Sequence, residues 1–103
     1  MKFKLNLAER INTMSILHAE GNFITLKVIR ELKLNLGVKD EEFKKFGIIQ
    51  KESQITWNEE GNKEIEFEIG EKATDIIIEQ LEKLDKSKKL EDKDFSIFEK
   101  FVK

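Results

Sequence analysis

The sequence predicts a single α+β domain spanning residues 1–103, with four to five helices and an antiparallel sheet of two or three strands. Three observations support this prediction. The chain has the length of one domain rather than two. Apolar residues recur with helical spacing before residue 47 and after residue 70. Between these regions, apolar and polar residues alternate as they do in strands.

The composition indicates a folded chain without cysteine chemistry. Hydrophobic and charged residues each make up 39% of the sequence, and charges of both signs are mixed along it. The absence of cysteine excludes disulfides and thiolate ligands. No apolar run approaches the ~20 residues of a membrane span, and the first residues lack the pattern of a signal peptide. We expect a soluble, cytoplasmic protein with no membrane partner.

The pattern of the first 37 residues predicts two helices. It leaves open whether residues 1–7 form a strand or belong to the first helix. Residues 1–7 alternate like a strand, but Asn6 and Glu9 have the spacing of a capping box, so a helix starting there is the alternative. That helix would run to about Ala19 and end at Gly21. A second helix is predicted from about residue 25, with Gly37 after it in the left-handed conformation.

The region from residue 40 to residue 69 predicts a short helix and then a hairpin. The helix would cover residues 40–46, with Phe43 and Phe46 facing inward and Gly47 ending it. The hairpin would join two antiparallel strands, in SQITWN and KEIEFEI, through the loop NEEGN, and the segment MKFKLNL is the candidate for a third strand. Trp57 shares the face of Ile55, which favours core packing; the alternative is an anchor for a partner.

The last third of the chain predicts two helices. The first covers about residues 71–85 and the second about residues 92–102. The core face of the first is predicted to consist of Ala73, Ile76, Ile77, Gln80, Leu81 and Leu84. In the second helix, Phe95, Phe98 and Phe101 recur at three-residue intervals. Such a stripe is typical of core packing, and the alternative is a homodimer contact.

The order helix, helix, short helix, strand is found in winged-helix DNA-binding domains, so a winged-helix-like topology is one form of the prediction. Nucleic-acid binding by such a domain would use basic residues in and after the second predicted helix: Lys27, Arg30, Lys33, Lys44 and Lys45. However, the short helix begins Asp40-Glu41-Glu42, and residues 48–69 hold two lysines against six glutamates. This negative charge disfavours a phosphate backbone as the partner.

The alternation of residues 63–69 predicts an acidic surface. Glu64, Glu66 and Glu68 fall on the face opposite Ile65 and Phe67, and the loop glutamates Glu59 and Glu60 lie close in sequence. We interpret these five glutamates as a candidate binding surface for a basic protein partner. The simpler alternative is a solvated sheet face.

The sequence contains little that predicts catalysis. His18 is the only histidine, and its simplest interpretation is a polar residue at a helix end rather than an acid–base group. It has no second histidine or cysteine with which to form a zinc site. The glycines match no phosphate-binding motif. We therefore expect a protein that is not an enzyme and has no cofactor or metal.

Three segments, AEGNFITLKVIRELKLNLG, SQITWN and IGEKATDIIIEQLEKLDKSKKLEDKDFSIFEKFVK, together resemble short proteins encoded in phages and prophages, which are mainly of unknown function. The resemblance covers most of the chain through its helix and strand patterns and brings no active-site residues. It implies a phage accessory protein that binds host or phage components, with inhibition or modulation of host machinery as one form of that role.

Overall fold

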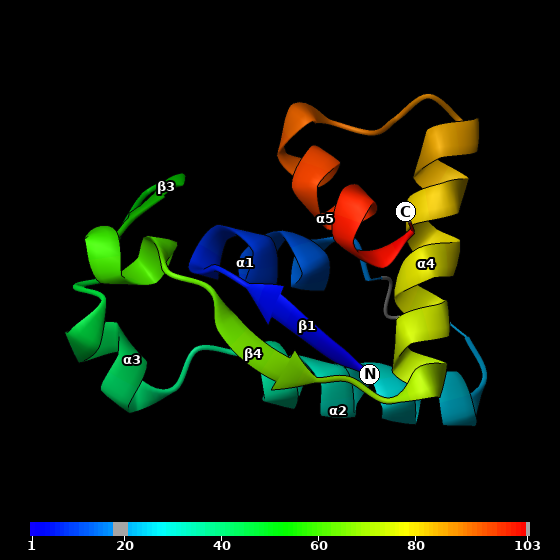
Figure 1. Ribbon diagram of the computed structural model, residues 1–103, viewed down its shortest axis with the longest axis horizontal. Coiled ribbons are helices and arrows are strands. Elements are labelled where there is room, and N and C mark those ends of the chain that lie inside the picture. Colours follow the sequence, from blue (N-terminus) through cyan, green and yellow to red (C-terminus); the bar gives the residue numbers. More distant parts are fainter. Residues whose placement is uncertain (18–20, 103) are drawn as a thin grey trace.

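The computed structural model describes residues 1–17 and 21–102, and Figure 1 shows helices arranged around a short pair of strands. The predicted α+β class is confirmed. The helices of the described chain are α1 (Leu7–Ser15), α2 (Phe23–Leu36), α3 (Asp40–Lys45), α4 (Glu71–Lys86) and α5 (Phe95–Phe101). Two short 3₁₀ turns accompany them, η1 (Glu59–Asn62) and η2 (Asp92–Asp94).

The strands form two separate antiparallel pairs. Strand β1 (Lys2–Leu5) pairs with β4 (Ile65–Glu68), and β2 (Ile49–Lys51) pairs with β3 (Gln54–Thr56). The predicted hairpin between residues 55–57 and residues 65–69 is therefore wrong. Glu52 takes a left-handed φ of 45°, which lets the chain turn back at once from β2 to β3. The loop NEEGN instead forms η1, where the Asn58 side chain accepts a hydrogen bond from the Glu60 amide at 2.9 Å.

The N-terminal segment is a strand and is followed at once by a helix. The Asn6 side chain accepts a hydrogen bond from the Glu9 amide, and the Glu9 carboxylate accepts one from the Asn6 amide, both at 2.9 Å. This capping box starts α1 directly after β1. Helix α1 ends at Ser15, four residues before the predicted Ala19, which lies outside the described residues.

Glycines stop two helices in different ways. Gly47, after α3, has a left-handed φ of 57°. The left-handed conformation predicted for Gly37 is wrong, because its φ of −61° and ψ of 151° are extended. A Cβ at Gly37 would lie 2.7 Å from the Lys33 carbonyl oxygen, so glycine is needed there for close approach to the end of α2.

The core lies where the β1–β4 pair, α2, α4 and α5 meet. Helix α4 confirms its predicted apolar stripe, with Ile77 and Leu81 fully buried. Phe46 is buried as predicted, but the inward position predicted for Phe43 is wrong, since Phe43 is 47% exposed. The buried cluster consists of Leu5, Leu17, Ile29, Leu32, Leu36, Ile69, Ile77, Leu81, Ile97 and Phe101.

The β2–β3 ribbon lies outside this core, and all six of its residues are exposed. Trp57, which follows β3, is half-buried and packs against Gly61 rather than joining the core cluster. Its indole Nε1 donates a hydrogen bond to Asn62 Oδ1 at 3.0 Å. None of the helices in the described ranges is long and apolar enough to cross a membrane.

Candidate functional site

The structure places cations next to most of the glutamates of the predicted acidic surface. Lys100 donates to Glu64, and Lys63 lies 3.0 Å from Glu60. On the β1–β4 pair, Glu66 stands opposite Lys4 and Glu68 stands opposite Lys2. Such cross-strand pairs of opposite charge are favourable.

Glu68 also lies 3.7 Å from the N-terminal ammonium, and Glu59 is exposed in the first turn of η1. Four of the five glutamates therefore lie next to positive charge, and the five do not form one continuous negative surface.

Lys100 on α5 forms hydrogen bonds to residues of β1 and α1, near the opposite end of the chain. Its Nζ donates to Glu9 Oε1 and to the Lys4 carbonyl, both at 2.7 Å, and also to Glu64. Burial alone would raise the pKa of Glu9, but the hydrogen bonds from Lys100, the Asn6 amide and Ser96 outweigh it and hold this pKa below its usual range. Burial likewise opposes the charged form of Lys100, yet Glu64 and Glu9 together raise its pKa. We assign this cluster to folding.

Arg10 on α1 forms a second internal cluster. It is 1% exposed, and its guanidinium contacts Glu42 at the start of α3 and the carbonyls of Leu36 and Gly37 at the end of α2. Its Cζ lies 4.9 Å from the centre of the Phe67 ring. The hydrogen bonds from Arg10 lower the pKa of Glu42. One carboxylate of the acidic first turn of α3 therefore has a structural partner.

The predicted nucleic-acid-binding cations divide between two helices. Lys27, Arg30 and Lys33 are exposed on α2, while Lys44 and Lys45 are exposed near the end of α3. Lys27 and Arg30 share the outward side of α2 with two exposed apolar residues, Phe23 and Leu34. We call these four residues the α2 face.

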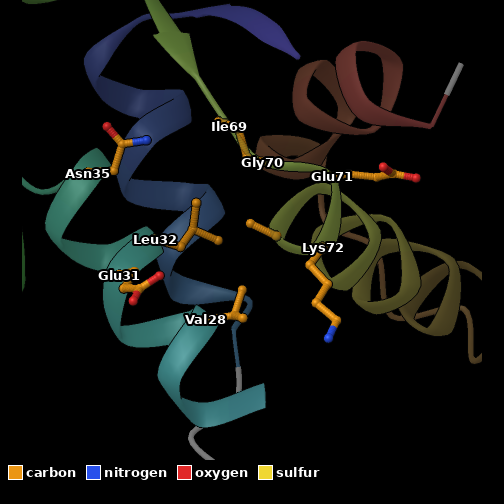
Figure 2. Close-up of a pocket in the computed structure, with 9 residues that line it drawn as sticks. Val28, Glu31, Leu32, Asn35, Ile69, Gly70, Glu71 and Lys72 are labelled. Atoms are coloured by element: carbon orange, nitrogen blue, oxygen red, sulfur yellow. The ribbon is translucent and has the colours of Figure 1, made fainter. Parts of the chain in front are cut away.

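A small pocket lies between α2 and the start of α4 (Figure 2). It has a volume of about 310 Å³, and Val28 and Leu32 of α2 face Ile69 across it. Ala73 also lines it. The charged groups at its edge, Glu31, Glu71 and Lys72, are all exposed. The floor of this pocket is apolar and its charged edge is solvated. Its polar groups do not point toward a common centre, as they do in sites that bind small ligands.

A larger hollow lies between the end of α4, the following connection and α5. Its volume is about 580 Å³, within the range of sites that hold ligand groups. Three apolar side chains, Leu90, Phe95 and Phe98, form its lining. Its charged lining residues are all acidic: Asp85, Glu91, Asp92 and Glu99. One of them, Glu91, lies 3.7 Å from Lys93. We call these seven residues the α4–α5 groove.

The sequence pattern did not identify this groove. Ile97, which was not assigned to the stripe, is fully buried, while Phe95 is 65% exposed. Phe101 is buried against the Phe3 ring, with ring centres 4.4 Å apart. The sequence did contain one indication of the groove. Helix α5 carries apolar residues at positions 95 and 98 and also at positions 97 and 101, and a single core-facing stripe does not accommodate both pairs.

Within residues 1–17 and 21–102, no group of three or more histidine, cysteine, aspartate or glutamate side chains is arranged to hold a metal ion. His18, the candidate acid–base group, lies outside the described residues. Comparison with protein-family models, with curated proteins and with solved structures finds no match to this chain.

Proposed function

We propose that this chain is a non-catalytic protein-binding domain and that the α4–α5 groove is its binding surface. The observation that carries the proposal is the exposed Phe95 ring in an apolar hollow beside Leu90 and Phe98. Partly exposed aromatic side chains in a concave apolar surface are typical anchors of protein interfaces. The carboxylates of Asp85, Asp92 and Glu99 around the hollow favour a partner segment that carries positive charge.

The resemblance to phage and prophage accessory proteins supports the same class of function. A small domain that binds a host protein needs an exposed contact surface and no catalytic group. Inhibition or modulation of host machinery is the form of binding that this resemblance adds to the proposal.

Nucleic-acid binding is a second candidate, supported by Lys27, Arg30 and Lys33 on the exposed side of α2. The first turn of α3 works against it, because Asp40 and Glu41 are exposed there. Acidic groups at the start of a helix stabilise the helix dipole but repel a phosphate backbone.

Affinity capture from a bacterial lysate, with and without nuclease, tests the proposal. The bait variants are Phe95→Ser and Asp92→Lys/Glu99→Lys in the groove. Glu79→Lys/Glu82→Lys is the matched control, because both of these glutamates are exposed on α4 outside the groove. We expect one stoichiometric protein that survives nuclease, is kept by the control variant and is lost by both groove variants.

Two other results would contradict the proposal in different ways. Partners lost on nuclease treatment, and also lost with Lys27→Glu/Arg30→Glu, would favour nucleic-acid binding. A partner indifferent to the groove variants but lost with Glu66→Lys/Glu68→Lys would return the binding surface to the outer side of β4.

A further inference from the structure

The α2 face has the opposite character to the α4–α5 groove. Its four residues, Phe23, Lys27, Arg30 and Leu34, follow each other at intervals of four, three and four, so they lie along one line of the helix. Phe23 is 80% exposed and Leu34 is 74% exposed, and the two cations lie between them. The face is therefore apolar at both ends and positive in the middle.

The opposite side of α2 is already used by the fold. Ile29, Leu32 and Leu36 are buried in the core, so the α2 face points away from it. A helix face whose side chains recur at these intervals is the type that packs into a groove on another protein. The α2 face thus needs a partner surface that is apolar and negative.

The α4–α5 groove of a second copy has both properties. Leu90, Phe95 and Phe98 offer an apolar floor, and the carboxylates of the rim offer negative charge. Figure 1 shows α2 along one side of the molecule and the connection from α4 to α5 on the opposite side. One molecule can therefore use both surfaces at the same time.

Contacts between like surfaces are disfavoured by charge. Two α2 faces packed antiparallel would bring Lys27 of one copy beside Arg30 of the other. Two grooves packed together would bring Asp85, Asp92 and Glu99 of one copy near the same three carboxylates of the other. Like charges across an interface cost binding free energy. The pairing that remains is heterologous, from the α2 face of one copy to the groove of the next.

We infer that this protein self-associates head to tail, with the α2 face of one copy seated in the α4–α5 groove of the next. This inference rests on the groove being a protein-binding surface, as proposed above, and it names a second copy of the chain as an occupant. The cations of the α2 face and the carboxylates of the groove lie at the protein surface, so the affinity of this contact falls as salt screens their charges.

Sedimentation velocity on the full chain tests the inference. We expect the average mass to rise with protein concentration up to about 1 mM, the range of a weak contact. Raising the salt concentration from about 0.05 M to about 0.5 M should weaken association about tenfold, because the Debye length shortens severalfold.

Two serine variants then separate the two surfaces. Phe23→Ser/Leu34→Ser removes the apolar ends of the α2 face, and Phe95→Ser removes the most exposed apolar side chain of the groove. Each variant alone is expected to remain monomeric. Their equimolar mixture should form a one-to-one dimer that grows no further, because each pair keeps one intact α2 face and one intact groove.

Phe43→Ser is the matched control, since Phe43 is an exposed aromatic residue outside both surfaces. It should associate as the wild type does. All the substituted residues are exposed, and unchanged thermal melting checks that the variants remain folded.

The inference is overturned if the wild type stays monomeric at about 1 mM, a limit set by the affinity scale of weak contacts. It also fails if the mixture of serine variants stays monomeric, or if Phe43→Ser disrupts association equally. A monomeric wild type whose captured partner still depends on Phe95 would reject self-association and leave the proposed function intact. Self-association with a partner that ignores Phe95 would reject the proposed capture of another protein instead.

Discussion

The guanidinium of Arg10 and the carboxylate of Glu42 form a two-point ion pair, with distances of 2.9 Å from Nη1 to Oε2 and from Nη2 to Oε1. Arg10 Nε also donates to the Leu36 carbonyl at 3.0 Å, and Nη2 donates to the Gly37 carbonyl at 2.9 Å. One buried side chain of α1 therefore provides hydrogen-bond donors for the carbonyl groups at the end of α2 and holds the first turn of α3 in place.

Replacing Arg10 should strongly destabilise the fold. In Arg10→Ala, the Glu42 carboxylate and two carbonyls lose their partner, and we expect a loss of about 3–5 kcal/mol in the free energy of unfolding. Urea unfolding followed by circular dichroism measures it. Arg30→Ala is the matched control, because Arg30 is the other arginine of the chain and is exposed, so it should change stability by less than about 0.5 kcal/mol. Equal losses in the two variants would refute this role of Arg10.

The lowered pKa of Glu42 predicts a decline of stability in acid. The hydrogen bonds from Arg10 lower this pKa below its ordinary value of 4.5 in the folded protein. The contribution of Glu42 is therefore complete above pH 4.5 and is lost as the pH falls through the lower folded-state pKa. Glu42→Gln should be less stable than the wild type at pH 7, and its stability should fall less steeply below pH 5. Thermal melts of wild type, Glu42→Gln and the exposed control Glu41→Gln as a function of pH measure this difference. If the stability of Glu41→Gln fell below pH 5 as little as that of Glu42→Gln, the acid dependence could not be assigned to Glu42.

Local sequence patterns predicted the helices well because helical periodicity is a local property. The stripe of α4 needed only residues 71–86, and its buried residues Ile77 and Leu81 are where the pattern placed them. The strands were harder to assign. Residues 55–57 lie closest in sequence to β4 among the candidate strands and were predicted to pair with it. Instead β4 pairs with β1, the candidate third strand at the N-terminus.

The ion pairs and the groove depend on contacts that sequence spacing does not reveal. Arg10 and Glu42 are 32 residues apart, and Lys100 and Glu9 are 91 residues apart. The groove depends on the orientation of α5 about its own axis, which places Ile97 in the core and leaves Phe95 exposed. A stripe of aromatic residues does not determine that rotation, because both sides of the helix are apolar.

Lys100 should contribute to stability through Glu9, which has a side chain only 5% exposed. Lys100→Met leaves this buried carboxylate without its cation, and we expect a loss of about 2–4 kcal/mol. Lys93→Met is the control, since Lys93 is 50% exposed and lies 3.7 Å from Glu91. The double variant Lys100→Met/Glu9→Gln should recover part of the loss in urea unfolding. Additive effects of the two substitutions would show that the residues are not coupled.

Gly61 should be needed for the packing of Trp57. A Cβ at Gly61 would lie 2.5 Å from Cδ1 of the indole, so Gly61→Ala must displace the ring. We expect a red shift in the emission of this sole tryptophan and a loss of about 1–3 kcal/mol. Gly70→Ala is the matched control for the emission, because a Cβ there would meet no atom within 4 Å. Unchanged emission in Gly61→Ala would mean that the indole does not rest on Gly61.

Two aromatic residues of α5 should separate folding from binding. Phe101 is 7% exposed and packs on Phe3, so Phe101→Ala should destabilise the fold by about 3–5 kcal/mol. Phe95 is 65% exposed, so Phe95→Ala should change stability by less than about 0.5 kcal/mol. Thermal and urea unfolding of the two variants give these values. If Phe95→Ala destabilised the protein as much as Phe101→Ala, Phe95 would belong to the core and the groove would lose its anchor. If Phe95→Ala melts like the wild type, its exposed ring contributes little to folding and remains available for a binding partner.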